Sequence, residues 1–245
     1  MDAVKIRCEQ CGATVSRIPD VGNPWLDAGI VPFSTLHYRT DREYWEKWFP
    51  ADFVTESFPG QFRNWFYSML AMATVLRRER PFKSLFGYAT LYGEDGRPMH
   101  KSWGNAIEFN EAADKMGVDV MRWLYFAQKP ENDLWFGYER ADEVRRQFLI
   151  PLWNVYSFFV TYANIDGWVP DTERPAVSER PDMDRWVLAE LDATVRAVRQ
   201  ELDDYKSHMA VRHLLGFVDG LSNWYVRRNR ERFWKSGMDD DKKTA

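Results

Sequence analysis

The spacing of apolar and polar positions changes several times along the chain, and each spacing predicts a different element. Alternation over 52–56 predicts a short strand, and the apolar stretch 85–92 predicts a buried strand followed by a tight turn at 93–96. Helical spacing predicts helices over 61–78 and 118–127. Elements in this order (strand, helix, strand, loop, helix) are typical of half of a parallel α/β sheet.

Two stretches beside these elements have a less regular pattern. Residues 23–50 are rich in aromatic and turn-forming residues, which predicts irregular structure over a packed surface. Asn110 is expected to cap a further helix that Ala112 and Ala113 continue. At the N-terminus, residues 1–22 are predicted to form a small ribbon that carries the two cysteines.

Beyond residue 141 the pattern changes to long helical stretches. One helix is predicted over 141–165, and a linker rich in proline and charge follows at 169–181. Two apolar rows then keep helical spacing and predict an antiparallel pair of helices with a break at 205–207, ending at the polar segment 239–243. The rows consist of Val187, Leu191, Val195, Val198 and Leu202, and of Val211, Leu214, Val218, Leu221 and Tyr225.

These changes of pattern divide the chain into four predicted segments. The segments are 1–22, 23–140, 141–180 and 181–245. The predicted fold class is α/β in the first part and all-α in the second. With 245 residues, of which 45% are apolar and 16% aromatic, the chain is long enough for one large domain or two small ones with a packed core.

Composition limits the partners of the chain. The net charge of −4 gives no overall attraction to polyanions, so any contact with nucleic acid requires a local basic patch, of which 227–235 is the clearest. We find no apolar run of 18 or more residues and no signal peptide, which predicts a cytoplasmic protein without a membrane partner. Cys8 and Cys11 have the spacing of half a metal knuckle rather than of a disulfide framework.

The strongest candidate chemistry lies in residues 97–105, which read Arg-Pro-Met-His-Lys-Ser-Trp-Gly-Asn. This segment follows a predicted strand and precedes a predicted helix. A lysine on such a loop is suited to hold the phosphates of a nucleotide while negative charge develops on them. Lys101 is therefore the first candidate catalytic residue, and His100 and Ser102 are candidates to add hydrogen bonds. The alternative is a surface loop whose side chains are merely solvated, which is the usual interpretation of a bare Lys-Ser pair.

The same segment resembles the second signature of class I aminoacyl-tRNA synthetases, a loop usually spelled Lys-Met-Ser-Lys-Ser, and in particular that of the isoleucyl-tRNA synthetase family. Met99, Lys101 and Ser102 agree with the signature, whereas Pro98 stands in the place of the first lysine and His100 in that of the serine. The resemblance implies that Met99 and Lys101 bind ATP, which is accompanied by Mg²⁺. Because Pro98 removes one cation, it also implies a weaker or differently positioned loop.

Two further segments resemble this family and imply a site for isoleucine. Residues 23–29 (Asn-Pro-Trp-Leu-Asp-Ala-Gly) resemble its Asp-Val-Trp-Phe-Asp-Ser-Gly segment, and 61–67 resemble Gln-x-Arg-Gly-Trp-Phe-Tyr. The resemblance implies that Trp25 and Trp65 wall the slot for the isoleucine side chain, and it assigns Asp27 to the same site. Such a slot cannot fully reject valine, because one methylene is worth only about 1–3 kcal/mol. Without the flanking matches, two core tryptophans would be the ordinary interpretation.

The side of the site that holds the adenylate departs from the family. Gln61 matches a family position close to the aminoacyl-adenylate, which implies a role in ATP binding. The acidic residue that the family has four positions earlier is Ser57 here, with Glu56 beside it, and the aspartate before the glutamine is Gly60. Glu56 is therefore carried over to the ATP site as the neighbouring carboxylate.

The cysteine pair and the C-terminal part add two more implied sites. Cys8 and Cys11 resemble one knuckle of a zinc ribbon in this family, which implies Zn²⁺ in the full-length protein, but a structural zinc site needs about four ligands. Residues 181–235 resemble the start of the anticodon-binding helical bundle. The resemblance implies that Arg227, Arg228 and Arg230 contact tRNA phosphates. The alternative for these arginines is a solvated basic face.

We therefore expect the second half of a class I Rossmann-type catalytic domain over 23–140, a connecting helix and linker over 141–180, and the start of an anticodon-binding bundle over 181–245. The implied reaction is ATP-dependent activation of isoleucine and its transfer to tRNA(Ile). The first class I signature, His-x-Gly-His, has no counterpart here, so an N-terminal half is expected to be missing and the piece alone to be poorly active or inactive. The alternatives are a valyl- or leucyl-type synthetase fragment, and a non-catalytic tRNA-binding module or truncated product.

Overall fold

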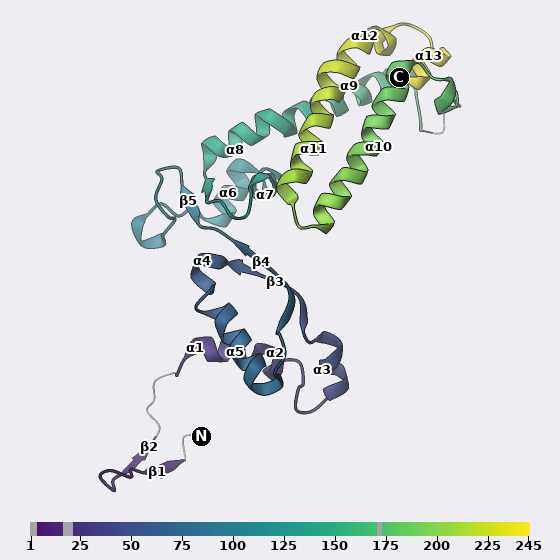
Figure 1. The fold of residues 1–245 in the computed structure, drawn as a ribbon. Coiled ribbons are helices and arrows are strands. Elements are labelled where there is room, and N and C mark those ends of the chain that lie inside the picture. Colours follow the sequence, from purple (N-terminus) through teal and green to yellow (C-terminus); the bar gives the residue numbers. More distant parts are fainter. Residues whose placement is uncertain (1–3, 17–21, 171–172) are drawn as a thin grey trace. The chain divides into compact units, whose positions relative to one another are not determined.

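The chain forms two compact units in the computed structural model, and each is described by itself (Figure 1). The units are Met1–Tyr88 and Ala89–Ala245. The structure describes residues 4–16, 22–170 and 173–245. The remaining parts of the predicted ribbon 1–22 and of the predicted linker 169–181 lie outside the described residues.

The described part of the N-terminal ribbon is a β-hairpin. β1 (Lys5–Arg7) pairs antiparallel with β2 (Thr14–Ser16), with Ile6 opposite Val15. Gly12 has a φ of 73° in the connecting turn, a left-handed conformation that favours glycine. Ile6 and Val15 are both exposed, so the hairpin buries no apolar core of its own.

The region 23–50 is helical, and the prediction of irregular structure there is wrong. Its helices are α1 (Pro24–Gly29), α2 (Val31–Ser34) and α3 (Arg42–Trp48). The turn-forming residues that suggested irregular structure begin these helices instead. The side chain of Asn23 accepts a hydrogen bond from the Trp25 N–H at 2.9 Å, and that of Asp41 accepts one from the Tyr44 N–H at 2.9 Å.

A parallel strand pair with its connecting helices forms the centre of the first unit. The elements are β3 (Ala51–Ser57), α4 (Phe58–Gln61), α5 (Trp65–Arg77) and β4 (Phe82–Tyr88). The two strands run parallel, which requires the helical crossover between them. Val54 of β3 is buried with Phe66 and Met69 of α5. The helix predicted over 61–78 is interrupted at its start, because Asn64 has a non-helical backbone conformation.

The stretch 85–92 is divided between two strands rather than forming one. β4 ends at Tyr88, and β5 (Leu91–Gly93) begins the second unit, where it pairs in parallel with β6 (Leu134–Phe136). Between them, Ala89 and Thr90 donate their N–H groups to Pro130 and Asp133. Residues 85–92 are mostly apolar because both strands are half-buried. The two strands nevertheless pair with different partners, β4 with β3 and β5 with β6.

Three short helices cover the β5–β6 pair. These are α6 (Phe109–Met116), α7 (Val118–Ala127) and α8 (Tyr138–Val144). Their core consists of Ala112, Met116, Val120, Met121, Leu124, Phe136 and Ala141. The expected cap at Asn110 is wrong, because the cap lies two residues earlier: the Glu108 carboxylate accepts a hydrogen bond from the Glu111 N–H at 3.0 Å, and Asn110 lies inside the helix.

The predicted helix 141–165 is confirmed and continues from α8 through a π-helical turn, Arg145–Leu149, into α9 (Ile150–Asp166). The π turn widens the helix directly before Pro151, where α-helical geometry would press the proline ring against a carbonyl of the preceding turn. The whole run Tyr138–Asp166 has 29 residues and a mean hydropathy of 1.2 in its most apolar window, and among the described residues it is the one helix long and apolar enough to cross a membrane. Helices of soluble proteins pass the same test. No unbroken apolar run predicted it, because polar residues such as Asn154 and Ser157 interrupt the pattern.

A helical hairpin follows, as predicted, and is shown in green to yellow in Figure 1. It consists of α10 (Asp182–Asp203), α11 (Ser207–Asp219), a π-helical segment (Gly220–Val226) and α12 (Arg227–Trp234). Tyr205, with a φ of 59°, lies in the break between the helices. The polar segment 239–243, at which the helical pair was predicted to end, follows α12 and forms most of α13 (Asp240–Thr244). Lys242 and Thr244 of this helix are buried.

Candidate active site

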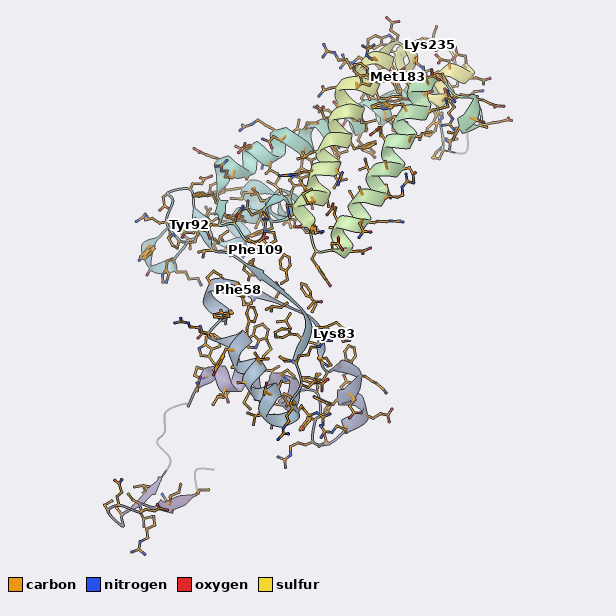
Figure 2. All side chains as sticks on the ribbon, in the orientation of Figure 1. Phe58, Lys83, Tyr92, Phe109, Met183 and Lys235 are labelled. Carbon is orange, nitrogen blue, oxygen red and sulfur yellow. The ribbon has the colours of Figure 1, made fainter. Side chains whose placement is uncertain are left out.

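The loop that carries Lys101 folds back along β5. The N–H of Gly93 donates to the carbonyl of Arg97 at 2.9 Å, and the N–H of Met99 donates to the carbonyl of Leu91 at 3.2 Å. Tyr92, labelled in Figure 2, forms a bridge with Pro98 between these two bonds. The first part of the loop, 97–99, is therefore held against β5 by backbone hydrogen bonds, and the candidate reactive side chains follow at 100–102.

Asn105 closes the loop from the other end. Its side-chain carbonyl accepts a hydrogen bond from the His100 N–H at 2.9 Å, and its amide donates to the Pro98 carbonyl at 3.1 Å and reaches Asp95 at 3.5 Å. The N–H of Arg97 and then its guanidinium lower the pKa of the Asp95 carboxyl below its usual range. These contacts join the start and the end of the loop through side chains.

The segment between these anchors is a single 3-10 turn, Lys101–Trp103. His100, Lys101 and Ser102 are all exposed, and the Nδ1 atom of His100 lies 2.8 Å from the Ser102 Oγ. Within the described parts of the chain, the Lys101 ammonium has no hydrogen bond or ion pair, so it is available to an anion. Met99 differs from these three, because it is half-buried against the core of the second unit.

The two segments assigned to isoleucine lie together in the first unit. Trp65 of α5 donates its Nε1–H to the carbonyl of Ala28 in α1 at 3.2 Å. Gly29 permits this approach, because a Cβ atom there would lie 2.6 Å from the backbone of Ser68. Trp25 is 37% exposed on α1, where Asp27 is also exposed, and Trp65 is half-buried.

An apolar hollow of about 560 Å³ lies beside α5 in the same unit. It is lined by Phe58, Phe62, Arg63, Phe66, Tyr67, Leu70, Phe82 and Leu85. Trp25 and Trp65 are not among its lining residues. Sequence reasoning did not predict this hollow, although the spacing of its phenylalanines along 58–66 was visible.

Glu56 and Gln61 lie at the carboxyl end of β3, where ligands bind in parallel sheets. The Glu56 carboxylate accepts hydrogen bonds from the Ser57 N–H at 2.7 Å and from the Tyr88 hydroxyl at 2.8 Å, and these lower its pKa in that order. Gln61 accepts a bond from the Trp65 N–H at 3.2 Å. Tyr88 was missed from the sequence, because the predicted strand 85–92 places it inside one strand, whereas in the structure it ends β4.

The basic patch 227–235 separates into two groups with different surroundings. Arg227, Arg228 and Arg230 are exposed, and the Arg228 guanidinium lies 3.9 Å from the ring centroid of Trp224. In contrast, Lys235, labelled in Figure 2, pairs with Asp239 and Asp241 at 2.8 and 2.9 Å.

Arg232, the remaining arginine of the patch, points inward. It forms two bonds of 2.7 Å to the carboxylate of Asp184, which is 1% exposed. The Tyr225 hydroxyl donates to the same carboxylate at 2.7 Å. Among the described residues, the exposed positive charge of the patch without an acidic partner is thus confined to the three arginines predicted to contact tRNA.

The cysteine pair by itself does not fit a structural zinc site. Both thiols are free, and the backbone N–H of Cys11 is the main cause that lowers the pKa of Cys8. A tetrahedral zinc site needs about four ligands. No cluster of three or more His, Cys, Asp or Glu side chains suited to a metal occurs in the described residues. By contrast, the exposed Lys101 ammonium suits the phosphates of ATP, and Mg²⁺ would be carried there by those phosphates.

Two models of known families match the chain. The model of the class I tRNA synthetases (I, L, M and V) matches residues 2–136, and that of the anticodon-binding domain of tRNA ligase matches residues 184–245. Because the first match covers more than half of the chain, the chain belongs to the class I tRNA synthetases of this family.

Among curated proteins, the chain is similar to isoleucine–tRNA ligases. It is 40% identical to that of Bacillus thuringiensis (strain Al Hakam) over 100% of this chain and 24% of the relative. It is 41% identical to that of Dehalococcoides mccartyi (strain ATCC BAA-2266) over 97% of this chain and 24% of the relative. The chain thus spans about a quarter of the length of these relatives. The predicted resemblance to the isoleucyl-tRNA synthetase family is confirmed.

Solved structures of other synthetases show the same fold. Methionyl-tRNA synthetase of Mycobacterium tuberculosis, bound by methionyl-adenylate, matches with a TM-score of 0.69 at 19% identity over 90% of this chain and 43% of that one. LeuRS of Agrobacterium radiobacter K84, in a ternary complex with tRNA and LeuAMS, matches with a TM-score of 0.65 at 17% identity over 89% and 28%. The predicted fold class, α/β followed by helices, is confirmed. The boundaries of the four predicted segments stay a prediction.

Proposed function

We propose that this chain is part of an isoleucine–tRNA ligase, an enzyme that activates isoleucine with ATP and transfers it to tRNA(Ile) in the cytoplasm. The observation that carries the proposal is the exposed Lys101 ammonium on a loop that is anchored at both ends, by β5 and by Asn105. The similarity to isoleucine–tRNA ligases over the whole chain supports the choice of isoleucine.

In the proposed mechanism, Lys101 binds the phosphates of ATP and stabilises the charge that develops as pyrophosphate leaves. His100 and Ser102 add hydrogen bonds to the same phosphates. Mg²⁺, when bound with ATP, supplies further positive charge. A single well-placed donor of this kind contributes about 2.7–4 kcal/mol of transition-state stabilisation, and such a donor acts best when it is held in position before the reaction.

The first unit supplies the proposed contacts to the amino acid and the adenylate. Trp25 and Trp65 form the apolar wall for the isoleucine side chain, with Asp27 nearby on α1. Gln61 and the ionised Glu56 lie at the end of β3 and bind the nucleotide portion. Apart from these, the exposed arginines of α12 bind tRNA phosphates, each contact adding salt-sensitive affinity.

The test is isoleucine-dependent pyrophosphate exchange in a chimera. This chain replaces the corresponding quarter of the Bacillus thuringiensis isoleucine–tRNA ligase, which supplies the remaining parts. We expect exchange with isoleucine, and a loss of about 10²–10³-fold on Lys101→Ala. Lys129→Ala is the matched control, because Lys129 is exposed and paired with Glu131. A folded chimera whose exchange is unaffected by Lys101→Ala would contradict the proposal, and faster exchange with valine or leucine would favour those synthetases instead.

The second candidate function is tRNA binding without catalysis. It is favoured by the exposed Trp224–Arg228 stack and by the neighbouring unpaired arginines, because aromatic and guanidinium planes both stack on bases. Salt-dependent tRNA binding by the 245-residue chain, with no exchange in the chimera, would support this function.

A further inference from the structure

An imidazole and a hydroxyl face each other across Lys101. The Nδ1 atom of His100 lies 2.8 Å from the Ser102 Oγ, and the imidazole also contacts the indole of Trp103, with 5.3 Å between ring centroids. The bond from the His100 N–H to Asn105 fixes the backbone that carries the imidazole. The pair is therefore placed by the same anchors as Lys101.

The direction of the hydrogen bond between them depends on the proton count of the imidazole. In a neutral ring with its proton on Nε2, Nδ1 accepts the Ser102 O–H. In an imidazolium both nitrogens donate, so Nδ1–H donates to the Ser102 Oγ and the hydroxyl proton is released for another acceptor. Protonation thus frees the O–H of Ser102 as a second donor beside the Nε2–H of His100, and it adds a positive charge beside Lys101.

Apart from Lys101, no unpaired positive charge of the described loop lies near the imidazole to oppose its protonation. Pro98 carries no charge, and the Arg97 guanidinium is paired with Asp95 at 2.7 Å. β5, against which the loop packs, has no charged side chain, and Glu94 is occupied by the Glu139 N–H at 2.7 Å. In the described loop, Lys101 is then the one cation without an acidic partner.

We propose that His100 binds a phosphate group in its protonated form, so that this loop takes up a proton from solvent when it binds a polyphosphate, with Ser102 donating to the same anion. The proposal rests on the proposed function, since it assigns the anion site to the Lys101 loop. It makes His100 a titratable substitute for the cation that Pro98 lacks.

The experiment measures binding of inorganic pyrophosphate to the 245-residue chain by calorimetry in buffers of different ionisation enthalpy. Affinity is compared at about pH 5.5 and about pH 8, on either side of the range in which imidazoles ordinarily change charge, and proton uptake is measured at about pH 7, within that range. Pyrophosphate itself titrates, so each value is compared with that of His100→Asn, which cancels the contribution of the ligand.

We expect the wild-type chain to take up more protons than His100→Asn and to bind about three- to tenfold more tightly at the lower pH, with no difference at the higher pH. His100→Lys should bind tightly at both pH values without the extra proton uptake. Ser102→Ala should weaken binding and keep the uptake. His37→Asn is the matched control, since His37 is an exposed histidine of the other unit.

Equal proton uptake by the wild-type chain and His100→Asn would overturn the inference, as would the absence of binding tighter than about 10 mM. Its failure is distinguishable from that of the proposed function. If Lys101→Ala abolishes exchange in the chimera while His100→Asn leaves proton uptake unchanged, the function stands and the inference falls. If proton-linked binding persists but the chimera shows no exchange, the inference stands and the function falls.

Discussion

Asn105 shows how much of the candidate site depends on a residue that does not itself contact substrate. Its side chain bonds to the backbone at His100 and at Pro98, so a single amide holds both sides of the loop. Replacing Asn105 with alanine should free the His100 N–H, and we expect its hydrogen exchange to accelerate by about tenfold, the loss of one bond of about 1.4 kcal/mol. Exchange at Tyr92 serves as the internal reference. Unchanged protection at His100 would show that the loop is held by other contacts.

Glu56 offers a second test at this scale. Its pKa is lowered first by the Ser57 N–H and then by the Tyr88 hydroxyl. Tyr88→Phe removes the second donor from the ionised carboxylate, so the pKa of Glu56 should rise towards its ordinary value without reaching it. A pH titration followed by carboxyl-carbon NMR measures this shift. A pKa that stays the same, or falls, would contradict the assigned hydrogen bond.

The sequence named the candidate side chains of the loop but not their hydrogen-bond partners. The resemblance named Lys101, Ser102 and His100, and the structure places them on one exposed turn. It could not name Asn105 or Tyr88 as partners. Asn105 contacts the loop only because the chain folds back after the 3-10 turn, and Tyr88 reaches Glu56 only because β4 pairs with β3. The spacing of apolar residues does not predict such tertiary contacts.

At the scale of elements, the errors fell mostly at helix ends. The turn-forming residues Asn23 and Asp41 begin helices here, since their side chains accept the first free N–H groups, and Glu108 does the same for α6. Long helices were predicted well, because a row of apolar positions repeated over several turns admits few other interpretations. A short segment of turn-forming residues fits a cap and a loop equally.

The C-terminal end of α5 supports a prediction about stability. Arg78, the residue after this helix, has a φ of 56°, a left-handed conformation that costs a residue with a Cβ about 1 kcal/mol and costs glycine little. Arg78→Gly should therefore raise the free energy of unfolding of the first unit by about 0.5–1 kcal/mol. Denaturant unfolding followed by tryptophan fluorescence measures it. Arg80→Gly, a nearby exposed position without that conformation, should give no gain, and a loss in Arg78→Gly would refute the argument.

For the molecule as a whole, the Asp184–Arg232 pair joins the most distant parts of the C-terminal bundle. Arg232 of α12 bonds to Asp184 of α10, to the Asp241 carbonyl and to Thr244 in α13, and its Nε pairs with the Asp241 carboxylate. Sequence reasoning placed Arg232 in a surface patch and did not name its partners. Only the folded bundle brings α10, α12 and α13 together, so the spacing of residues along the sequence could not show this pairing.

Removing this arginine should be costly. Arg232→Met leaves the Asp184 carboxylate buried without its partner, so we expect a loss of about 3–5 kcal/mol in the free energy of unfolding of the bundle. Arg230→Met is the matched control, because Arg230 is an exposed neighbour on the same helix. Chemical denaturation followed by helical circular dichroism measures both. Similar small losses in the two variants would show that the buried pair contributes little.

The same carboxylate predicts the response to acid. Burial alone would raise the pKa of Asp184, but the Arg232 guanidinium and the Tyr225 hydroxyl outweigh it, and the pKa is lowered. A lowered pKa contributes stability that is present above the unfolded value of about 3.9 and is lost as the pH falls through the folded value. Unfolding of the bundle should therefore become easier only below about pH 4. Loss of stability beginning near neutral pH would assign the effect to other groups.

The widened turn at Arg145–Leu149 has a consequence for the length of the helix that contains it. In it the Ile150 N–H reaches back five residues to Arg145, so the turn contains one residue more than an α-helix would need. Deleting one residue there would restore the narrower ladder and leave the turns on either side of it in register. The side chains of α9 would then keep their directions, although the chain had become one residue shorter.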